Sequence, residues 1–255
     1  MSEIVRKIHA DLLAKIQAEP EKKFQILIRL DEEWFQEVGK WLPDEALVNI
    51  IKGAFGFWNR RFGNVVFIEF VKAWHLRLNY MVFEIKGELI PLLEQIPQVE
   101  WISEQIKYYA IDLPEEGIPG AERFFHPLIN QTIPYLGFDK IHQDKQFIEK
   151  GLGKEGPPAG IADTGISMST GEKWSWLYEK PEGPDRGRYR ILEGKDFSGS
   201  PRGYMDGVGH GSHIANIMAS AGKKYLGCVP QGLLYSAKVL NDMGWGYTSW
   251  IIKGI

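Results

Sequence analysis

The chain has 255 residues, of which 44% are hydrophobic and 25% charged, a balance typical of globular proteins with a buried core. Its formal net charge of -3 offers no attraction to nucleic acid or to an anionic membrane surface, so we expect neither as a partner. The single cysteine, Cys228, excludes a disulfide within the chain and is compatible with a reducing compartment.

The N-terminal segment has neither the long apolar core nor the small-residue cleavage site of a secretory signal. No uncharged stretch approaches the roughly 18 residues that a membrane-spanning helix needs. We therefore expect a cytoplasmic protein, with secretion as the alternative. Ile4, Ile8, Leu12 and Ile16 recur at helical spacing and predict an amphipathic helical extension over residues 1–20.

Residues 21–112 alternate strand and helix patterns. The stretch "FQILIRL" places Phe24, Ile26, Ile28 and Leu30 on one face, as in a half-buried strand. The following predicted elements are a helix after Asp44, strands over 64–70 and 75–85, a helix over 88–96 and a strand over 99–106. This order predicts a ferredoxin-like α+β domain, a fold that hosts many functions. Residues 113–130 hold three prolines and no clear period, and they predict a linker.

Residues 131–255 have the pattern of an α/β domain with a parallel sheet. "AGIADTGIS" predicts the end of a buried strand, "GSHIANIMASA" a buried helix, "LLYSAKVL" a strand and "TSWIIKGI" a helix. "WSWLYEKPEGPDRGRYR" predicts a loop. Pro157 and Pro158 cannot donate ladder hydrogen bonds, so the strand before Asp163 should be short or distorted. The last helix has no C-terminal cap, which we interpret as an incomplete C-terminal domain.

Asp163 ends its predicted strand, and His210 begins the predicted helix. Reactive groups in parallel α/β sheets gather at the carboxyl ends of strands and at the neighbouring helix starts. A carboxylate and an imidazole brought together there can form a pair in which the carboxylate orients a general base. The glycines around His210 would allow a substrate to approach closely.

These segments resemble a known family. "IADTGIS" and "DGVGHGSHIANIMA" are similar to the aspartate and histidine motifs of subtilisin-like serine proteases, peptidase family S8. "LLYSAKVLNDMGWGYTSWIIKGI" is similar to the strand, substrate-binding segment and helix that follow in that family. The upstream unit resembles the family's ferredoxin-like propeptide, which assists folding and inhibits the protease. "NQTIPYLGFDKIH" resembles the start of a mature catalytic domain.

The resemblance implies roles for particular residues. Asp163 would orient and stabilise the imidazole, and His210 would act as general base and then as general acid. Gly244, Trp245 and Gly246 would pair with an extended peptide or protein substrate by strand addition. Trp245 stands where relatives often have a small residue, so it would reshape the groove. Residues 108–111 could enter the cleft as the propeptide's own substrate-like tail, or they could be an ordinary strand end.

The family's third catalytic residue, a serine in a Gly-Thr-Ser-Met-Ala motif, has no counterpart among these residues. Ser167 in "GISM" superficially resembles it but lies only four residues after Asp163, so we do not expect it to be the nucleophile. We therefore expect the 255 residues alone to be inactive. The alternative function is a non-enzymatic remnant whose propeptide-like domain inhibits a separate protease or helps it to fold.

We expect no cofactor and no metal. His210 and His213 form an HxxH pair, which would allow an unrelated α/β metalloenzyme, but no further ligand motif accompanies them. His213 should instead be buried and hydrogen-bonded. The resemblance implies calcium as the other alternative, because Gln131 stands at a position that is a calcium ligand in some members of the family, but the loop "SAGKKYLG" is shorter than the calcium-binding loop of those relatives and argues against such a site. Cys228 should be a small core residue.

Overall fold

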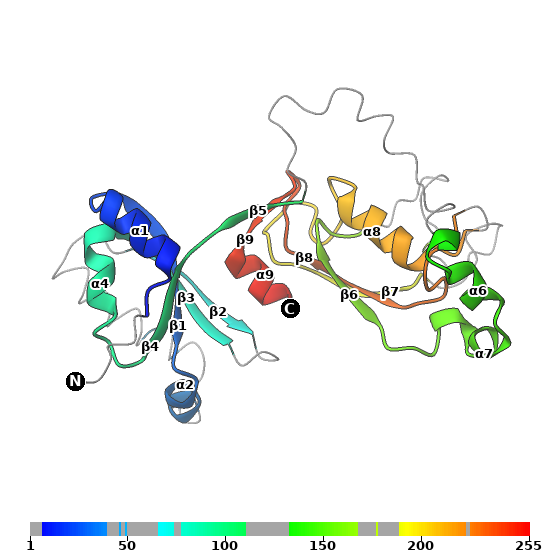
Figure 1. The fold of residues 1–255 in the computed structure, drawn as a ribbon, viewed down its shortest axis with the longest axis horizontal. Helices are drawn as coiled ribbons and strands as arrows, with labels where there is room; N and C mark the ends of the chain where they lie inside the picture. The colour runs from blue at the N-terminus through cyan, green and yellow to red at the C-terminus, as the bar shows by residue number, and fades with distance from the viewer. Residues whose placement is uncertain are drawn as a thin grey trace, which may run out of the picture. The chain divides into compact units, whose positions relative to one another are not determined.

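The computed structural model describes residues 7–39, 46, 49, 66–73, 78–110, 133–167, 177, 189–222 and 225–255. The chain forms two compact units (Figure 1). The first unit comprises residues up to Lys107 together with Tyr247–Lys253 and Ile255, and the second comprises Tyr108–Gly246 with Gly254. Among the described helices, none has both the length and the apolar character needed to cross a membrane.

The first unit contains a four-stranded sheet. Its elements are α1 (Ala10–Ala18), β1 (Lys23–Leu30), α2 (Glu32–Gly39), β2 (Val66–Ala73), β3 (Leu78–Lys86), a 3₁₀ turn (Gly87–Leu89), α4 (Ile90–Leu93) and β4 (Val99–Glu104). The strand order is β2-β3-β1-β4, and each neighbouring pair is antiparallel. The helix expected after Asp44 lies largely outside the described residues, and α2 is a helix that the sequence pattern did not predict.

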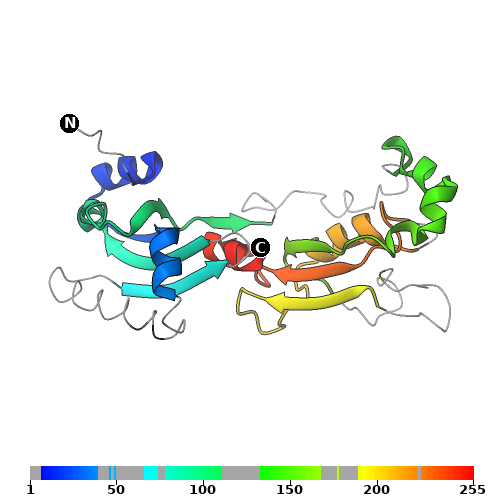
Figure 2. The same cartoon turned by 90° about the horizontal axis from the view of Figure 1, so that it is seen from below.

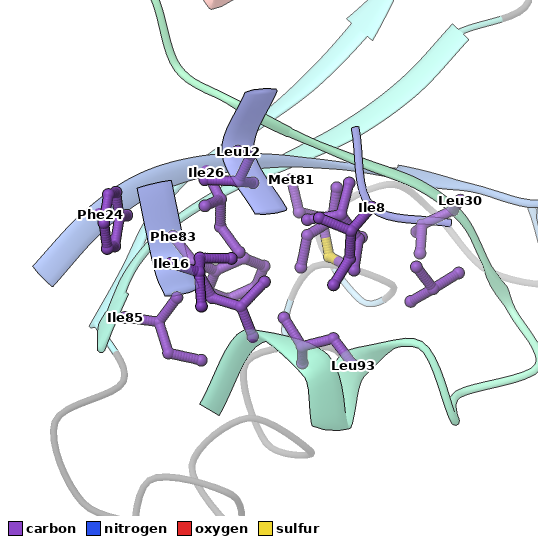
Figure 3. Packing of buried hydrophobic residues seen from close by; sticks show 14 of the residues in the cluster. Ile8, Leu12, Ile16, Phe24, Ile26, Leu30, Met81, Phe83, Ile85 and Leu93 are labelled. Carbon is purple, nitrogen blue, oxygen red and sulfur yellow. The ribbon is translucent and has the colours of Figure 1, made fainter. Parts of the chain in front are cut away.

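One face of this sheet carries the main core. Alternate residues of β1, namely Phe24, Ile26, Ile28 and Leu30, are buried together on that face, in agreement with the predicted alternation. Side chains from the helices α1 and α4 converge on them, as Figure 3 shows for Leu12, Ile16 and Leu93.

The N-terminal segment is part of this core. The helix α1 begins at Ala10, where His9 Nδ1 accepts a hydrogen bond from the Asp11 N–H. Ile8 therefore precedes the helix that the sequence pattern placed around it, and it forms a parallel bridge with Ile102 of β4. Residues 7–18 thus add a short extended segment and a helix to the packing of the sheet.

The last helix, α9 (Thr248–Gly254), packs on the opposite face of the sheet. Ile252 packs against the buried side chains of Leu27 in β1 and Val82 in β3. Beside this contact, Gln105 Nε2 donates a hydrogen bond of 3.0 Å to Ser249 Oγ. The sequence assigned α9 to the C-terminal domain of residues 131–255, whereas its residues up to Lys253 lie in the first compact unit.

The second unit contains a parallel sheet with one long helix beside it. Its elements are α6 (Phe138–Gln143), α7 (Lys145–Glu149), a 3₁₀ turn (Gly151–Gly153), β6 (Ala159–Asp163), β7 (Ile191–Asp196), α8 (His210–Ala219) and β8 (Leu234–Lys238). The sheet order is β6-β8-β7, with both pairs parallel (Figure 2). The parallel sheet confirms the predicted α/β character, and β7 is a strand that the sequence pattern missed.

The strand β6 is short but regular. It begins at Ala159, directly after Pro157 and Pro158, and all five of its residues pair in register with β8. The prolines therefore set where the strand begins and leave its ladder intact. A separate two-stranded sheet joins β5 (Lys107–Tyr109) to β9 (Trp245–Tyr247). The linker predicted over residues 113–130 lies outside the described residues.

Candidate active site

Asp163 and His210 are in direct contact. Asp163 is the last residue of β6 and His210 is the first of α8, so a strand end and a helix start bring them together. The His210 Nδ1 atom lies 2.8 Å from Asp163 Oδ1 and 2.9 Å from Asp163 Oδ2. An ionised carboxylate only accepts hydrogen bonds, so this contact favours the tautomer with its proton on Nδ1.

Glycines create the space for this contact. A β-carbon on Gly211 would lie 2.1 Å from the carbonyl oxygen of Gly165 and 3.2 Å from Asp163 Cβ. Gly209, immediately before the helix, has a φ of 100°, a value that residues with a β-carbon rarely adopt. The sequence "GHG" around His210 therefore allows α8 to begin directly against the end of β6.

The other ring nitrogen of His210 is available for chemistry. Among the described residues, none forms a hydrogen bond with Nε2, and a quarter of the side chain is exposed. With Nδ1 protonated and facing Asp163, Nε2 carries a lone pair that can accept a proton. The geometry therefore equips His210 to act as a general base toward a group placed at Nε2.

Ser167 does not occupy the place of such a group. Its backbone N–H donates to Ser212 Oγ at 2.9 Å, and its carbonyl oxygen accepts from the Tyr189 hydroxyl at 3.2 Å. In the described part of the chain, no hydrogen bond joins the Ser167 hydroxyl to His210. These contacts favour a structural role for the segment that follows Asp163.

Two residues that the sequence interpretation did not single out hold the site together. Thr164, which is fully buried, donates through its hydroxyl to Asp206 Oδ1 at 2.9 Å. The Asp206 carboxylate is also buried, and burial alone would raise its pKa. Hydrogen bonds from Gly209, Ser212 and Val208 outweigh that effect and lower the pKa of Asp206 below its usual value. In the sequence, the one indication of this role was that Asp206 lies four residues before His210, just ahead of the predicted helix.

The expected substrate-binding segment forms an edge strand. Trp245 and Gly246 lie in β9 and Gly244 precedes it with a φ of 78°, while a β-carbon on Gly246 would lie 2.1 Å from the Val239 carbonyl oxygen. The strand β5 pairs with β9, and the Ala110 N–H donates a 2.7 Å hydrogen bond to the Gly244 carbonyl oxygen. This edge thus holds an extended segment of the same chain. Ile111, the last residue of the expected tail, is outside the described residues.

The structure corrects the expectation for His213. The His213 side chain is exposed on α8. Its imidazole ring forms no hydrogen bond with any residue that the structure describes. The described ranges contain no group of three or more His, Cys, Asp or Glu residues able to hold a metal ion. Gln131, the candidate calcium ligand, lies outside those ranges.

Cys228 is only partly buried. It borders a mainly apolar cavity of about 550 Å³ between α6, α7 and the loop at Val229 and Pro230. Burial raises the pKa of its thiol, so the thiolate needed for nucleophilic chemistry is disfavoured. The core clusters formed by the described residues do not include Cys228, so the expectation of a core residue is wrong.

Parts of the chain are similar in sequence to known proteases. The chain is 28% identical over 172 residues to the Thermostable alkaline protease of Halalkalibacterium halodurans, covering 66% of this chain and 42% of that protein. It is 32% identical over 127 residues to Subtilisin DY of Bacillus licheniformis, covering 49% of this chain and 40% of that protein. Subtilisin E of Bacillus subtilis is 44% identical over 54 residues, 20% of this chain and 14% of that protein.

No established protein-family profile matches the chain. The matched region covers about two fifths of the length of the first two of these relatives. The relationship nevertheless agrees with the parallel sheet of the second unit. The chain is related to the subtilisin-like serine proteases of peptidase family S8.

Proposed function

We propose that these residues form part of the precursor of a subtilisin-like serine endopeptidase, with Asp163 and His210 as the acid–base pair of its catalytic triad. The observation that carries the proposal is the contact of 2.8 Å between Asp163 and His210 Nδ1, made at the carboxyl edge of a parallel sheet. The Nε2 atom adds the second requirement, a proton acceptor, because none of the described residues forms a hydrogen bond with it and a quarter of the His210 side chain is exposed.

The proposed chemistry follows from that orientation. His210 Nε2 removes the proton from a serine hydroxyl as its oxygen attacks the scissile carbonyl carbon, and Asp163 stabilises the resulting imidazolium. The imidazolium then protonates the leaving amine, which leaves an acyl-enzyme that water hydrolyses by the reverse proton transfers. The 255 residues contain no Gly-Thr-Ser-Met-Ala motif, so we propose that they supply the acid–base half of the reaction only.

The same proposal assigns the edge strand to substrate binding. Gly244, Trp245 and Gly246 would bind an extended peptide through backbone hydrogen bonds. The hydrogen bond from Ala110 to Gly244 supports this role, because it is the kind of bond that a substrate backbone would make. We propose that residues 108–111 are the propeptide tail held in the cleft. The Trp245 side chain would then limit the size of substrate residues beside it.

The first unit would be the propeptide. Its element order and its strand order β2-β3-β1-β4 support a ferredoxin-like domain over residues 21–112, as the sequence predicted. In this proposal, the helix α9 belongs to the protease and lies on the Leu27 and Val82 face of the propeptide sheet. That contact would be the means by which the propeptide recognises its protease.

A peptide-hydrolysis assay on the purified 255-residue chain tests the claim about catalysis. We expect no turnover of a fluorogenic peptide above the buffer rate, because the acyl-enzyme needs a serine nucleophile. Turnover that His210→Ala abolishes and His213→Ala leaves intact would contradict the proposed division of the triad. His213 is a matched control because it lies exposed on the same helix.

The Leu27 and Val82 face also favours a second candidate function, inhibition or folding assistance of a separate protease. A fragment of residues 1–112 lacks α9, so Leu27 and Val82 would be uncovered and free to receive the corresponding helix of another protease. We expect this fragment to slow Subtilisin E, and Leu27→Asp to weaken the effect. No slowing by a folded fragment would exclude this function.

A further inference from the structure

Thr164 connects the strand that carries Asp163 to the helix that carries His210. Its hydroxyl donates to Asp206 Oδ1 at 2.9 Å and accepts the Gly211 N–H at 2.9 Å. Its own backbone N–H donates to Asp163 Oδ1 at 2.6 Å. One fully buried residue therefore contacts the catalytic carboxylate, the first turn of α8 and the Asp206 carboxylate.

The Asp206 carboxylate binds the backbone around the start of α8. Its Oδ1 atom accepts from the N–H groups of Val208 and Gly209 at 2.9 and 2.7 Å, and its Oδ2 atom accepts from the Ser212 N–H at 2.8 Å. The first N–H groups of a helix have no partners within the helix, and the helix dipole favours a negative charge near them. Asp206 therefore caps α8 as an anion.

The groups that cap the N-terminus of α8 come from residues other than its N-cap residue. The N-cap residue, Gly209, has no side chain, so the usual serine or aspartate cap is absent. The acceptors come from Thr164, at the end of β6, and from Asp206, in the loop before the helix. Ordering the helix start in this way also fixes it against β6, which a cap within the helix would not do.

A buried lysine in β8 joins the segment after β6 to the loop before α8 through hydrogen bonds. Lys238 Nζ donates to the carbonyl oxygens of Thr164 and Met205 at 2.7 and 2.8 Å. Its charge is balanced by Asp242 Oδ1 at 2.7 Å. Because the Lys238 side chain is fully buried, these contacts must stay satisfied whenever the second unit is folded.

We propose that Thr164 and Asp206 are positioning residues, which hold the His210 imidazole in register with Asp163 by capping α8 from the strand side. This proposal rests on the proposed function in one respect only, the assignment of Asp163 and His210 as a catalytic acid–base pair. In this arrangement, the hydrogen bond from the Gly211 N–H to the Thr164 hydroxyl fixes the first turn of α8 against the end of β6. Because Gly211 follows His210 directly, this bond also fixes the position of His210. Loss of either group should loosen the pair while the sheet remains folded.

The test uses the full chain labelled with ¹⁵N in its histidine rings and recorded at pH 9. The His210 signals are assigned by their loss in His210→Gln. In the unchanged chain, we expect the proton on Nδ1 and slow exchange of that proton with water, because it donates to Asp163. We expect Thr164→Val and Asp206→Asn to speed that exchange by about tenfold or more and to move protons toward Nε2, since each loses a buried hydrogen bond.

Thr164→Ser is the matched control, because it keeps the hydroxyl and removes only a methyl group. It should retain the Nδ1 proton and an exchange rate within about twofold of the unchanged chain, whereas Thr164→Val, which is nearly isosteric, should not. An unchanged Nδ1 signal in both Thr164→Val and Asp206→Asn would overturn the proposal. So would global unfolding of Thr164→Val alone, because it would show that the network supports the fold as a whole.

The signal is independent of turnover. It reports the contact between His210 and Asp163 in a chain that needs no nucleophile and no substrate. If the proposed protease function failed, the exchange measurement would still decide whether Thr164 and Asp206 position the imidazole. If the positioning failed, peptide hydrolysis by a serine-containing form could still be tested.

Discussion

Gly211 lies so close to Gly165 that a β-carbon on Gly211 would come within 2.1 Å of the Gly165 carbonyl oxygen. The backbones cannot separate without also lengthening the hydrogen bond from the Gly211 N–H to Thr164 Oγ1. We therefore expect Gly211→Ala to lower the free energy of unfolding of the second unit by about 1–3 kcal/mol, as overpacking does. Urea unfolding, followed by circular dichroism, measures the change.

Gly160 provides the control for that substitution. It lies in β6, three residues before Asp163, and a β-carbon there would meet no atom within 4 Å. Gly160→Ala should change the free energy of unfolding by less than about 1 kcal/mol, because it mainly reduces the freedom of the unfolded chain. Equal destabilisation by the two substitutions would show that the close approach at Gly211 is unimportant.

The contact of α9 with the first unit gives a second prediction. Ile252 packs on Leu27 and Val82, so Ile252→Ala should cost about 1–3 kcal/mol of stability through lost burial and an unfilled space. Ile255, at the end of the chain, is 59% exposed, and Ile255→Ala should be neutral within about 0.5 kcal/mol. Thermal and urea unfolding of both variants would test this difference. A neutral Ile252→Ala would mean that α9 contributes little to the first unit.

The lowered pKa of Asp206 predicts sensitivity to acid. A carboxyl group whose pKa is lower in the folded state stabilises the fold above its unfolded pKa, and that stability is lost as the pH falls through the folded pKa. Asp206→Asn should therefore reduce stability at pH 7, and the difference from the unchanged chain should shrink below about pH 4, near the unfolded carboxyl value. Urea unfolding across this pH range is the measurement.

Glu149→Gln is the control for the acid prediction. Glu149 is exposed on α7 in the same unit, and in the described part of the chain its carboxylate accepts no hydrogen bond. The variant should follow the unchanged chain at every pH. A difference between Asp206→Asn and the unchanged chain that stays constant down to pH 3 would argue against a charge-dependent role for Asp206.

The sequence was sufficient to predict the contact between Asp163 and His210, because the features that indicate it are local. The apolar run ending at Asp163 and the glycine-flanked His210 before a small-residue helix indicate a strand end and a helix start. In a parallel sheet, such ends meet at one edge, so the proximity of the two residues followed from the topology. The alternation from Phe24 to Leu30 likewise predicted which face of the first sheet is buried.

The remaining features depend on tertiary contacts that sequence patterns do not show. The strand β7 has exposed Leu192 and Glu193 at its start, with an irregular register there, so it lacks the alternation of a half-buried strand. Lys238 looks like a solvent-facing residue of β8, yet its charge is compensated internally. His213 was expected to be buried because its helix is apolar, but the buried face of α8 is formed by smaller residues, Ala215 and Ala219.

Peptide hydrolysis by the product of the whole reading frame that contains these residues tests the proposed role of Asp163 and His210 most directly. The proposal requires that hydrolysis of a fluorogenic peptide be lost in Asp163→Asn and His210→Ala and retained in His213→Ala, which changes an exposed histidine on the same helix. Hydrolysis that survives His210→Ala would contradict the assignment of the Asp163–His210 pair as the acid–base half of a serine protease.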